Sequence, residues 1–205
     1  DPETFMILDV LALQALYGKN MQSHSGNSIH KYVADGAYST LWDASGTDEI
    51  NFENSSYDWD IVLPWYQWDT SDELGGHAVT YTNTNAEYPT DLIWLLGNIE
   101  NAKGGAGNDR IFGNILNNIL SGGEGSDKIE GWEGNDTLIG GSGRDTFYFS
   151  YGWGIDTVID FNASEDNIVI LDRDFNNLDL SQVAKESDGN GFLTYVLDQD
   201  SKIIL

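Results

Sequence analysis

Four aspartates in the middle of the sequence have a spacing that suits metal binding. Each stands at the sixth place of a nine-residue phrase, G-G-x-G-x-D-x-U-x, in which U is a large apolar residue. The phrase occurs in five consecutive copies between residues 104 and 148, and the second copy carries Asn118 at its sixth place. The four aspartates are Asp109, Asp127, Asp136 and Asp145. Carboxylates beside backbone carbonyl groups offer only oxygen ligands, which suit a hard cation such as Ca²⁺.

The glycines of the phrase make backbone oxygens available as well. Glycine tolerates positive φ, so the first, second and fourth places allow sharp turns that point carbonyl groups inward. A lone Gly-Asp cluster usually marks a surface turn, but five phased copies with an apolar residue after each sixth place favour cation binding. The candidate ligands of the repeats are Gly104, Ala106, Asn108, Asp109, Gly122, Glu124, Ser126, Asp127, Gly131, Glu133, Asn135, Asp136, Gly140, Ser142 and Asp145.

The phrase resembles the nonapeptide of RTX proteins, which forms a calcium-binding parallel β-helix. On that pattern two nonapeptides make one coil, and each turn stacks on the turn two copies away. We therefore expect Asp127 to lie between Asp109 and Asp145, and Asn118 to lie on Asp136. The neutral amide of Asn118 predicts a weak or absent site in the second copy. The apolar eighth-place residues should face inward: Ile111, Leu120, Ile129, Leu138 and Phe147.

The chain is strongly acidic. It has 34 Asp and Glu residues against 9 Lys and Arg residues, for a net charge of −25 over 205 residues. This imbalance argues against nucleic acid and anionic membrane surfaces as partners, because both carry the same sign of charge. The cation-free chain also repels itself, so that bound Ca²⁺ would couple metal binding to folding.

The sequence argues against several other kinds of site. The chain contains no cysteine, which excludes disulfides and thiolate metal sites. Its histidines, His24, His30 and His77, lie in unrelated segments without an H-E-x-x-H zinc motif. There is no G-x-S-x-G elbow, no apolar run long enough for a transmembrane helix and no signal peptide pattern. We therefore expect no catalytic site in this chain.

Two acidic segments outside the repeats are further candidates for cation binding. The segment LWDASGTDEINF has the rhythm of a roll turn, which makes Asp43 and Asp48 candidate ligands of an outlying calcium site. A simple acidic turn is an equally weighted alternative for these two residues. After the repeats, Asp156 and Asp160 fall where closing calcium ligands would lie.

Aromatic residues are concentrated between residues 57 and 94. Trp59, Trp65, Tyr66 and Trp68 are candidates for carbohydrate contact, because a ring face can stack on the apolar face of a pyranose. Core packing is the favoured alternative, since aromatic side chains are more often buried.

The start of the chain has a different pattern. Residues 1–18 have an apolar periodicity between Pro2 and Gly18 that predicts a buried helix.

Several phrases together resemble one family, the serralysins. The phrase FMILDVLALQALYGKN is similar to the helix that closes the serralysin protease domain, and LWDASGTDEINF is similar to their W-D-A-G-G-x-D-T-x-D-F segment. The phrase LLGNIENAKGGAGNDRIFGNILNNILSGGEGSDKIEG resembles the start of their β-roll, and DTVIDFNASEDNIVIL resembles the strands that follow it. The likeness covers almost the whole chain except residues 57–90.

The resemblance implies an all-β fold: a calcium-binding parallel β-roll (RTX) flanked by antiparallel β-strands, with one N-terminal helix. Residues 1–98 would hold the helix and an aromatic-rich β segment that packs on the roll. Residues 99–205 would hold the roll, the C-terminal strands and a secretion tail. Protease activity is not implied for this chain, because the zinc-binding motif would lie upstream of Asp1.

The resemblance also implies partners and a location. It predicts several bound Ca²⁺ ions and export from a bacterium through type I secretion machinery to the extracellular space. A polysaccharide is a further candidate partner, because similar C-terminal units occur in adhesins and polysaccharide-degrading enzymes. The final residues, DQDSKIIL, resemble the end of type I secretion substrates, and an ordinary edge strand is the alternative reading of this tail.

Overall fold

The structure is a computed structural model that describes residues 26–32, 38–43, 45–64, 76–80, 89–172, 176–187 and 193–205. The helix predicted over residues 1–18 lies outside these residues, as do the carbohydrate-contact candidates Trp65, Tyr66 and Trp68. No helix in the described part of the chain is long and apolar enough to cross a membrane.

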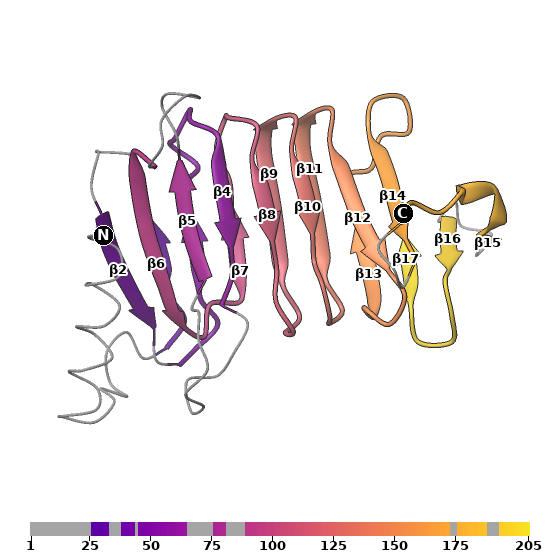
Figure 1. Ribbon diagram of the computed structural model, residues 1–205, viewed down its shortest axis with the longest axis horizontal. Coiled ribbons are helices and arrows are strands. Elements are labelled where there is room, and N and C mark those ends of the chain that lie inside the picture. Colours follow the sequence, from indigo (N-terminus) through magenta and orange to yellow (C-terminus); the bar gives the residue numbers. More distant parts are fainter. Residues whose placement is uncertain are drawn as a thin grey trace.

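The described strands form two sheets that run along the length of the molecule (Figure 1). One sheet has nine strands, in the spatial order β1 (Ile29–Lys31), β3 (Glu49–Asn51), β7 (Asn101–Lys103), β9 (Ile119–Gly125), β11 (Thr137–Gly143), β13 (Ile155–Val158), β17 (Lys202–Ile204), β16 (Leu193–Val196) and β15 (Ala184–Ser187). The other sheet has eight, in the order β14 (Asn167–Leu171), β12 (Thr146–Ser150), β10 (Lys128–Glu130), β8 (Arg110–Phe112), β4 (Trp59–Val62), β5 (Gly76–Thr80), β6 (Asp91–Gly97) and β2 (Tyr38–Asp43).

In the repeat region the chain passes from one sheet to the other and back with every coil. Strands β8, β10 and β12 pair in parallel, with Ile129 between Ile111 and Phe147. In the opposite sheet β9 and β11 pair in parallel, with Leu120 beside Leu138. Neighbouring coils are offset by 18 residues, as the hydrogen bond between Asp109 and Asp127 records. The prediction that two nonapeptides make one coil is therefore confirmed.

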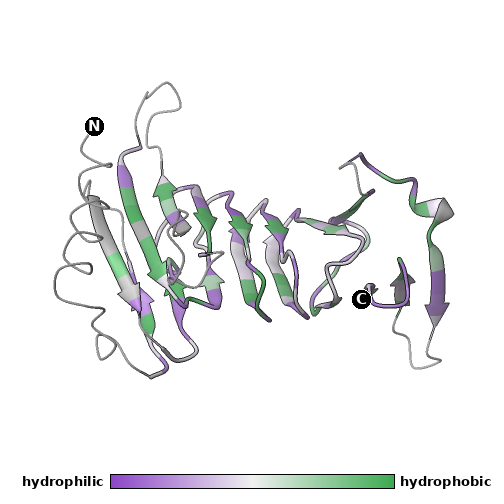
Figure 2. Ribbon diagram, turned by 60° about the horizontal axis from the view of Figure 1, so that its bottom comes forward, coloured by the Kyte–Doolittle hydropathy of each residue, from purple (hydrophilic) through white to green (hydrophobic). Residues whose placement is uncertain are grey.

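The eighth-place apolar residues fill the space between the two sheets. All five are fully buried, as predicted: Ile111, Leu120, Ile129, Leu138 and Phe147. The same core continues into the flanking coils through Ile50, Phe52, Ile61, Val158, Ile168 and Ile170. Figure 2 shows hydrophobic residues recurring in successive strands along the roll. Each buried side chain of this size contributes roughly 1.5–3 kcal/mol, so this column is a main source of the stability of the roll.

Antiparallel strands flank the parallel coils at both ends. Strand β5 pairs antiparallel with β4 and with β6, and this insertion widens the eight-stranded sheet. At the other end, β16 pairs antiparallel with both β15 and β17. The fold is therefore the predicted all-β arrangement of a parallel roll with antiparallel flanks. Strands on both sides of residue 98 belong to the same two sheets.

The C-terminal strand β17 corrects one expectation from the sequence. It pairs with β13 on one side and with β16 on the other, so it is an internal strand and not an edge strand. Its Ile203 is fully buried in the core. Residues 202–204 are therefore an integral part of the folded roll.

Trp59 is a core residue, which corrects the hypothesis that it contacts carbohydrate. The side chain is only 2% exposed, and its ring stacks on Phe52 with 4.0 Å between ring centroids. Its Nε1 donates a hydrogen bond to Oγ of Ser55 at 2.8 Å. Burial against another ring with the indole N–H satisfied is the more favourable environment for a tryptophan.

Candidate calcium sites

Sixth-place aspartates form a continuous ladder along one set of turns. The backbone N–H of Asp109 donates to Oδ1 of Asp127 at 2.7 Å, and that of Asp127 donates to Oδ1 of Asp145 at 2.9 Å. The N–H of Asp145 donates in turn to Oδ1 of Asp166 at 3.0 Å. The predicted position of Asp127 between Asp109 and Asp145 is confirmed, and Asp166 extends the ladder by one coil.

A second ladder follows the other set of turns. The N–H of Asn118 donates to Oδ1 of Asp136 at 2.8 Å, and that of Asp136 donates to Oδ1 of Asp156 at 3.0 Å. The predicted stacking of Asn118 on Asp136 is therefore confirmed. The step from Asp136 to Asp156 spans 20 residues, so this last coil is longer than a pair of nonapeptides.

The second carboxylate oxygen of these aspartates is buried without a protein partner. Among the described residues, Oδ2 of Asp127, Asp136 and Asp145 accepts no hydrogen bond and is inaccessible to solvent. A buried polar atom without a partner costs about 1–3 kcal/mol, and a charged one costs more. A cation at these turns would remove that penalty, so the residues present fit Ca²⁺.

The first-place glycines let oxygen atoms of neighbouring coils approach each other. A methyl group on Gly122 would lie 2.1 Å from Oδ2 of Asp127 and 2.7 Å from the carbonyl oxygen of Gly140. A methyl group on Gly104 would lie 2.2 Å from Oδ2 of Asp109 and 2.4 Å from the carbonyl oxygen of Gly122. Only glycine leaves room for a carboxylate and a carbonyl group to converge at this place.

The turn conformation itself depends on the second and fourth places. In the third copy, Gly123 and Gly125 have φ values of 116° and 120°. Gly122, at the first place, does not have a positive φ, and its glycine is needed instead for the close approach of neighbouring oxygen atoms. In the fourth copy the second place is Trp132, which has a φ of 68° and stacks on Trp153 at 5.0 Å between centroids. Such a backbone conformation costs of the order of 1–3 kcal/mol, and an aromatic pair contributes about 0.5–1.5 kcal/mol, so the stacking offsets part of the strain.

Burial raises the pKa of the ladder carboxyl groups. The pKa rises to about 7 for Asp127 and Asp136 and to about 8 for Asp156, mainly because burial disfavours the charged form. The carboxylates of Asp109 and Asp145 raise the pKa of Asp127 further, whereas the hydrogen bond from the Asp109 N–H opposes the rise. A bound cation favours the ionised form, so calcium binding should release protons.

The remaining candidates in the turns stand at the third and fifth places of the nonapeptide. Asn108 Oδ1 accepts the N–H of Ser126 at 2.8 Å, and Asn135 Oδ1 accepts the N–H of Ile155 at 2.8 Å. These fifth-place amides therefore tie adjacent coils together. The third-place side chains are all exposed: Ala106, Glu124, Glu133 and Ser142.

Asn118 closes its own turn with hydrogen bonds. Its Nδ2 donates to the carbonyl oxygen of Glu100 at 2.7 Å and to Oδ1 of Asn114 at 3.0 Å. Its Oδ1 accepts the N–H of Asn114 at 2.9 Å, and Nδ2 of Asn114 donates to the carbonyl oxygens of Pro64 and Ile99. The amide groups of Asn118 and Asn114 thus bind each other and neighbouring carbonyl groups, and the weak or absent site in the second copy stays a prediction.

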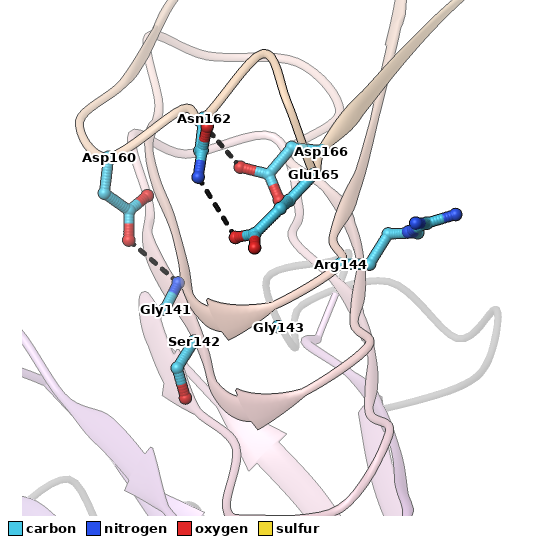
Figure 3. Close-up of a pocket in the computed structure, with 8 residues that line it drawn as sticks. All are labelled: Gly141, Ser142, Gly143, Arg144, Asp160, Asn162, Glu165 and Asp166. Atoms are coloured by element: carbon cyan, nitrogen blue, oxygen red, sulfur yellow. Dashed lines mark hydrogen bonds between the residues drawn. The ribbon is translucent and has the colours of Figure 1, made fainter.

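The loop after β13 covers the last repeat turn (Figure 3). Oδ1 and Oδ2 of Asp160 accept the N–H groups of Gly140 and Gly141 at 2.9 and 2.8 Å, so Asp160 lies against this turn and caps it. Oδ2 of Asp166 accepts the N–H of Asn162 at 2.8 Å. The loop and the turn line a polar pocket of about 620 Å³ that is open to solvent. The sequence analysis missed Asp166, although Asp166-Asn167-Ile168 repeats the pattern of an aspartate two residues before an inward apolar residue.

Asp43 and Asp48 meet at the first coil, and His30 joins them. Both aspartates are fully buried. The ligating atoms of the three side chains lie within 4.8 Å of one another, with Nε2 of His30 at 2.8 Å from Oδ2 of Asp43. Burial raises the pKa of Asp48 to about 6. The sequence predicted the two aspartates together, whereas His30 is brought in by the parallel pairing of β1 with β3.

Comparison with known proteins identifies the repeats. The RTX calcium-binding nonapeptide repeat (4 copies) matches residues 97–115 and 112–147. Serralysin G of Dickeya chrysanthemi is 33% identical over 193 residues, which cover 88% of this chain and 37% of serralysin G. The metalloprotease AprA of Pseudomonas entomophila is 32% identical over 133 residues, which cover 55% of this chain and 23% of the protease. The chain thus spans well under half the length of these curated relatives.

Proposed function

From the premise that this chain carries RTX calcium-binding nonapeptide repeats and is homologous to the serralysins, we propose that it is a non-catalytic module that folds around several Ca²⁺ ions after secretion. The observation that carries this proposal is the set of buried carboxylate oxygens without a protein partner in Asp127, Asp136 and Asp145. These oxygens occur at equivalent positions in successive coils, so we propose one calcium site at each equivalent turn.

The proposal assigns the ligands turn by turn. One row of ions binds to the turns of the first ladder. Its carboxylate ligands are those of Asp109, Asp127 and Asp145. Its backbone oxygen ligands come from the stacked turns: Gly104, Ala106, Asn108, Gly122, Glu124, Ser126, Gly140 and Ser142. The second row uses the other ladder with its turn: Asp136 and Asp156 with Gly131, Glu133 and Asn135. Asp160 and Asp166 complete the last coil of the first row, since both already bind backbone N–H groups of that turn.

Calcium would control folding because the turns bring like charges together. With a net charge of −25, the cation-free chain repels itself, and each ladder adds buried carboxylates to that repulsion. Calcium at roughly 10⁻⁴–10⁻³ M, the range of weak extracellular modules, would load the turns and stabilise the folded state by mass action. In a calcium-poor cytosol the chain would stay unfolded and fit through the channel of type I secretion machinery.

The module supplies binding and folding and has no catalytic role in this proposal. The raised pKa values of Asp127, Asp136 and Asp156 belong to carboxyl groups of the turns, where a cation accounts for them. The relatives are a serralysin and metalloproteases by name, so we propose that protease activity belongs to parts of those proteins that this chain does not span.

Calcium titration with circular dichroism tests the proposal. We expect the β-sheet signal at physiological temperature and pH only with calcium, and we expect chelation to move the cooperative thermal transition to a much lower temperature. Asp127→Asn should weaken calcium binding measured by calorimetry, because it removes one charge from the centre of the first ladder. Glu186→Gln is the matched control, since Glu186 is exposed on β15, outside the ladders. The same melting curve with and without calcium would show that the proposed function is wrong.

Export needs its own experiment, because the tail is also part of the fold. Deletion of residues 198–205 should abolish secretion by a type I system. Ile203→Ala weakens the core but leaves the rest of the tail in place, so this variant should still be exported. Normal secretion of the deletion variant would exclude the tail as a secretion signal.

A further inference from the structure

The middle of the outer face of the nine-stranded sheet carries no acidic side chain. Strands β7, β9, β11, β13 and β17 are consecutive neighbours in that sheet. Each has a buried residue that faces the core: Ala102, Leu120, Leu138, Val158 and Ile203. Successive side chains of a strand point to opposite faces, so the residues on either side of these point outward. The outward residues, here named the acid-free face, are Asn101, Lys103, Ile119, Ser121, Thr137, Ile139, Ile155, Thr157, Ile159, Lys202 and Ile204.

The acidic residues of the same strands lie elsewhere. Asp156 is buried in the second ladder, and Glu124 stands at the third place of a turn. Along the sheet, the acid-free face is limited by Glu49 on β3, which pairs with Asn101, and by Glu186 on the outermost strand β15. In a chain with 34 acidic residues, this face is therefore distinct from its surroundings.

Backbone pairing makes the acid-free face continuous. Thr137 lies between Ile119 and Thr157 in one row of side chains. In the next row, the N–H of Ile159 donates to the carbonyl oxygen of the residue before Ile139 at 3.0 Å, which places Ile159 beside Ile139. The result is a flat surface of isoleucine and threonine side chains.

Three isoleucines of the acid-free face are open to solvent. Ile119 is 50% exposed, Ile155 is 40% exposed and Ile159 is 63% exposed. Single exposed apolar residues are normal, whereas a contiguous group marks an interaction surface. Aliphatic side chains offer no ligand to calcium, so the metal-binding turns do not account for this group.

Charge restricts the partner that this face can bind. The chain has a net charge of −25, so it repels an anionic partner. A cationic partner is drawn to the acidic turns rather than to the acid-free face, which carries Lys103 and Lys202. A second copy of the chain brings an identical face, and a face-to-face pair places no carboxylate opposite another within the contact.

We infer that the acid-free face is a self-association surface on which a second copy of this chain binds, with the two sheets face to face about a twofold axis. Five strands at a spacing of about 4.8 Å span about 19 Å, and two packed sheets lie about 10 Å apart. A contact of this width is at the low end of interface sizes, so the dimer is weak and reversible. The inference goes beyond the proposed function, because the face holds no calcium ligand.

Sedimentation equilibrium of the full, untagged chain in saturating calcium tests the inference. Over protein concentrations from about 1 µM to about 1 mM, we expect the average mass to rise from that of one chain toward that of two. Added salt should strengthen the dimer, because it screens the repulsion between two acidic copies. Circular dichroism of the same samples reports whether the chain is folded.

Two variants place a charge in the contact. Ile159→Glu should weaken the dimer by roughly 10–100-fold, because it buries a carboxylate without a partner. Ile29→Glu is the matched control: Ile29 is also 63% exposed, but it lies on β1, beyond Glu49 and outside the acid-free face. Ile119→Lys lowers the net negative charge, which would strengthen an association governed by net charge, yet it should weaken this dimer.

The outcomes separate the inference from the proposed function. A folded chain that stays monomeric up to about 1 mM would overturn the inference and leave the proposed function intact. Equal losses in Ile159→Glu and Ile29→Glu, or association that continues beyond two copies, would overturn it as well. A chain that formed the dimer but folded without calcium would instead overturn the proposed function alone.

Discussion

The backbone N–H of Asp127 donates to Oδ1 of Asp145 at 2.9 Å, across 18 residues of sequence. Asp127 likewise accepts the N–H of Asp109 on its own Oδ1, which leaves Oδ2 of both Asp127 and Asp145 buried and without a protein partner. One oxygen of each carboxylate therefore sets the register of the coils, and the other remains for a cation. The same side chains set the register of the coils and offer oxygen atoms to a cation, so we expect calcium binding and folding to be coupled.

Gly122→Ala should remove the calcium ion that lies between the turns of the third and fifth copies, which stack on each other in the roll. The new methyl group would lie 2.1 Å from Oδ2 of Asp127, in the space where carboxylate and carbonyl oxygens converge. We expect about one fewer bound ion by calorimetry and a loss of about 1–3 kcal/mol from the free energy of unfolding in calcium. Gly152→Ala is the control: its methyl group meets no atom within 4 Å, so only the strain of its positive φ remains. An unchanged calcium count in Gly122→Ala would contradict the assignment.

Asn118→Asp should destabilise the calcium-free protein. The substitution removes the Nδ2 donor that binds the carbonyl oxygen of Glu100 and Oδ1 of Asn114, and it leaves acceptors facing one another. We expect the free energy of unfolding in urea with chelator to fall by about 1–3 kcal/mol, and calcium to restore part of that loss. Asn117→Asp is the matched control, because its Oδ1 accepts the N–H of Asn135 and an aspartate keeps that acceptor. Equal losses of unfolding free energy in the two variants would show that the hydrogen bonds of the Asn118 amide do not stabilise this turn.

The stability of the calcium-free protein should fall as pH rises. The folded-state pKa is about 7 for Asp127 and Asp136 and about 8 for Asp156, above the ordinary value near 4. The folded chain therefore holds more protons than the unfolded chain between about pH 4 and pH 8, and its stability declines across that window. We expect a higher melting temperature at pH 5 than at pH 8 with chelator. With saturating calcium, which competes with protons, the trend should flatten or reverse, and an identical decline in both conditions would be the contrary result.

Ile203→Ala should weaken the whole roll. Ile203 is fully buried on β17, which is an internal strand between β13 and β16. Truncation of a buried isoleucine costs about 2–5 kcal/mol, measured by urea unfolding in saturating calcium. Ile159→Ala removes the same atoms from a side chain that is 63% exposed, so this control should change the stability little. Similar values for both variants would mean that β17 is not part of the cooperative unit.

Local spacing was sufficient to predict the repeat turns. The period of nine residues determines which side chain follows each turn, and an apolar residue two places after each aspartate must face inward if the chain coils. The positions of Ile129 and Asp127 in the structure follow from that rule together with the two nonapeptides per coil that the RTX resemblance implies. The aspartate ladder was predictable for the same reason, because equal spacing stacks equal residues.

Other parts of the sites depend on contacts that no local spacing encodes. Asp166 enters the first ladder after a coil of irregular length, 21 residues from Asp145. His30 reaches Asp43 only because β1 and β2 lie in opposite sheets that close on each other. The burial of Trp59 likewise depends on Phe52 and Ser55 in the turn before its strand.

The sequence by itself determined the coil and the oxygen-rich turns, because both follow from a repeat that acts over nine residues, and its resemblance to the serralysins implied the all-β fold around them. Only the tertiary structure decided that β17 is internal, that Trp59 is core and that a histidine completes the first cluster. These outcomes depend on which distant strands become neighbours, and that choice is made by the packing of the whole roll rather than by any one segment.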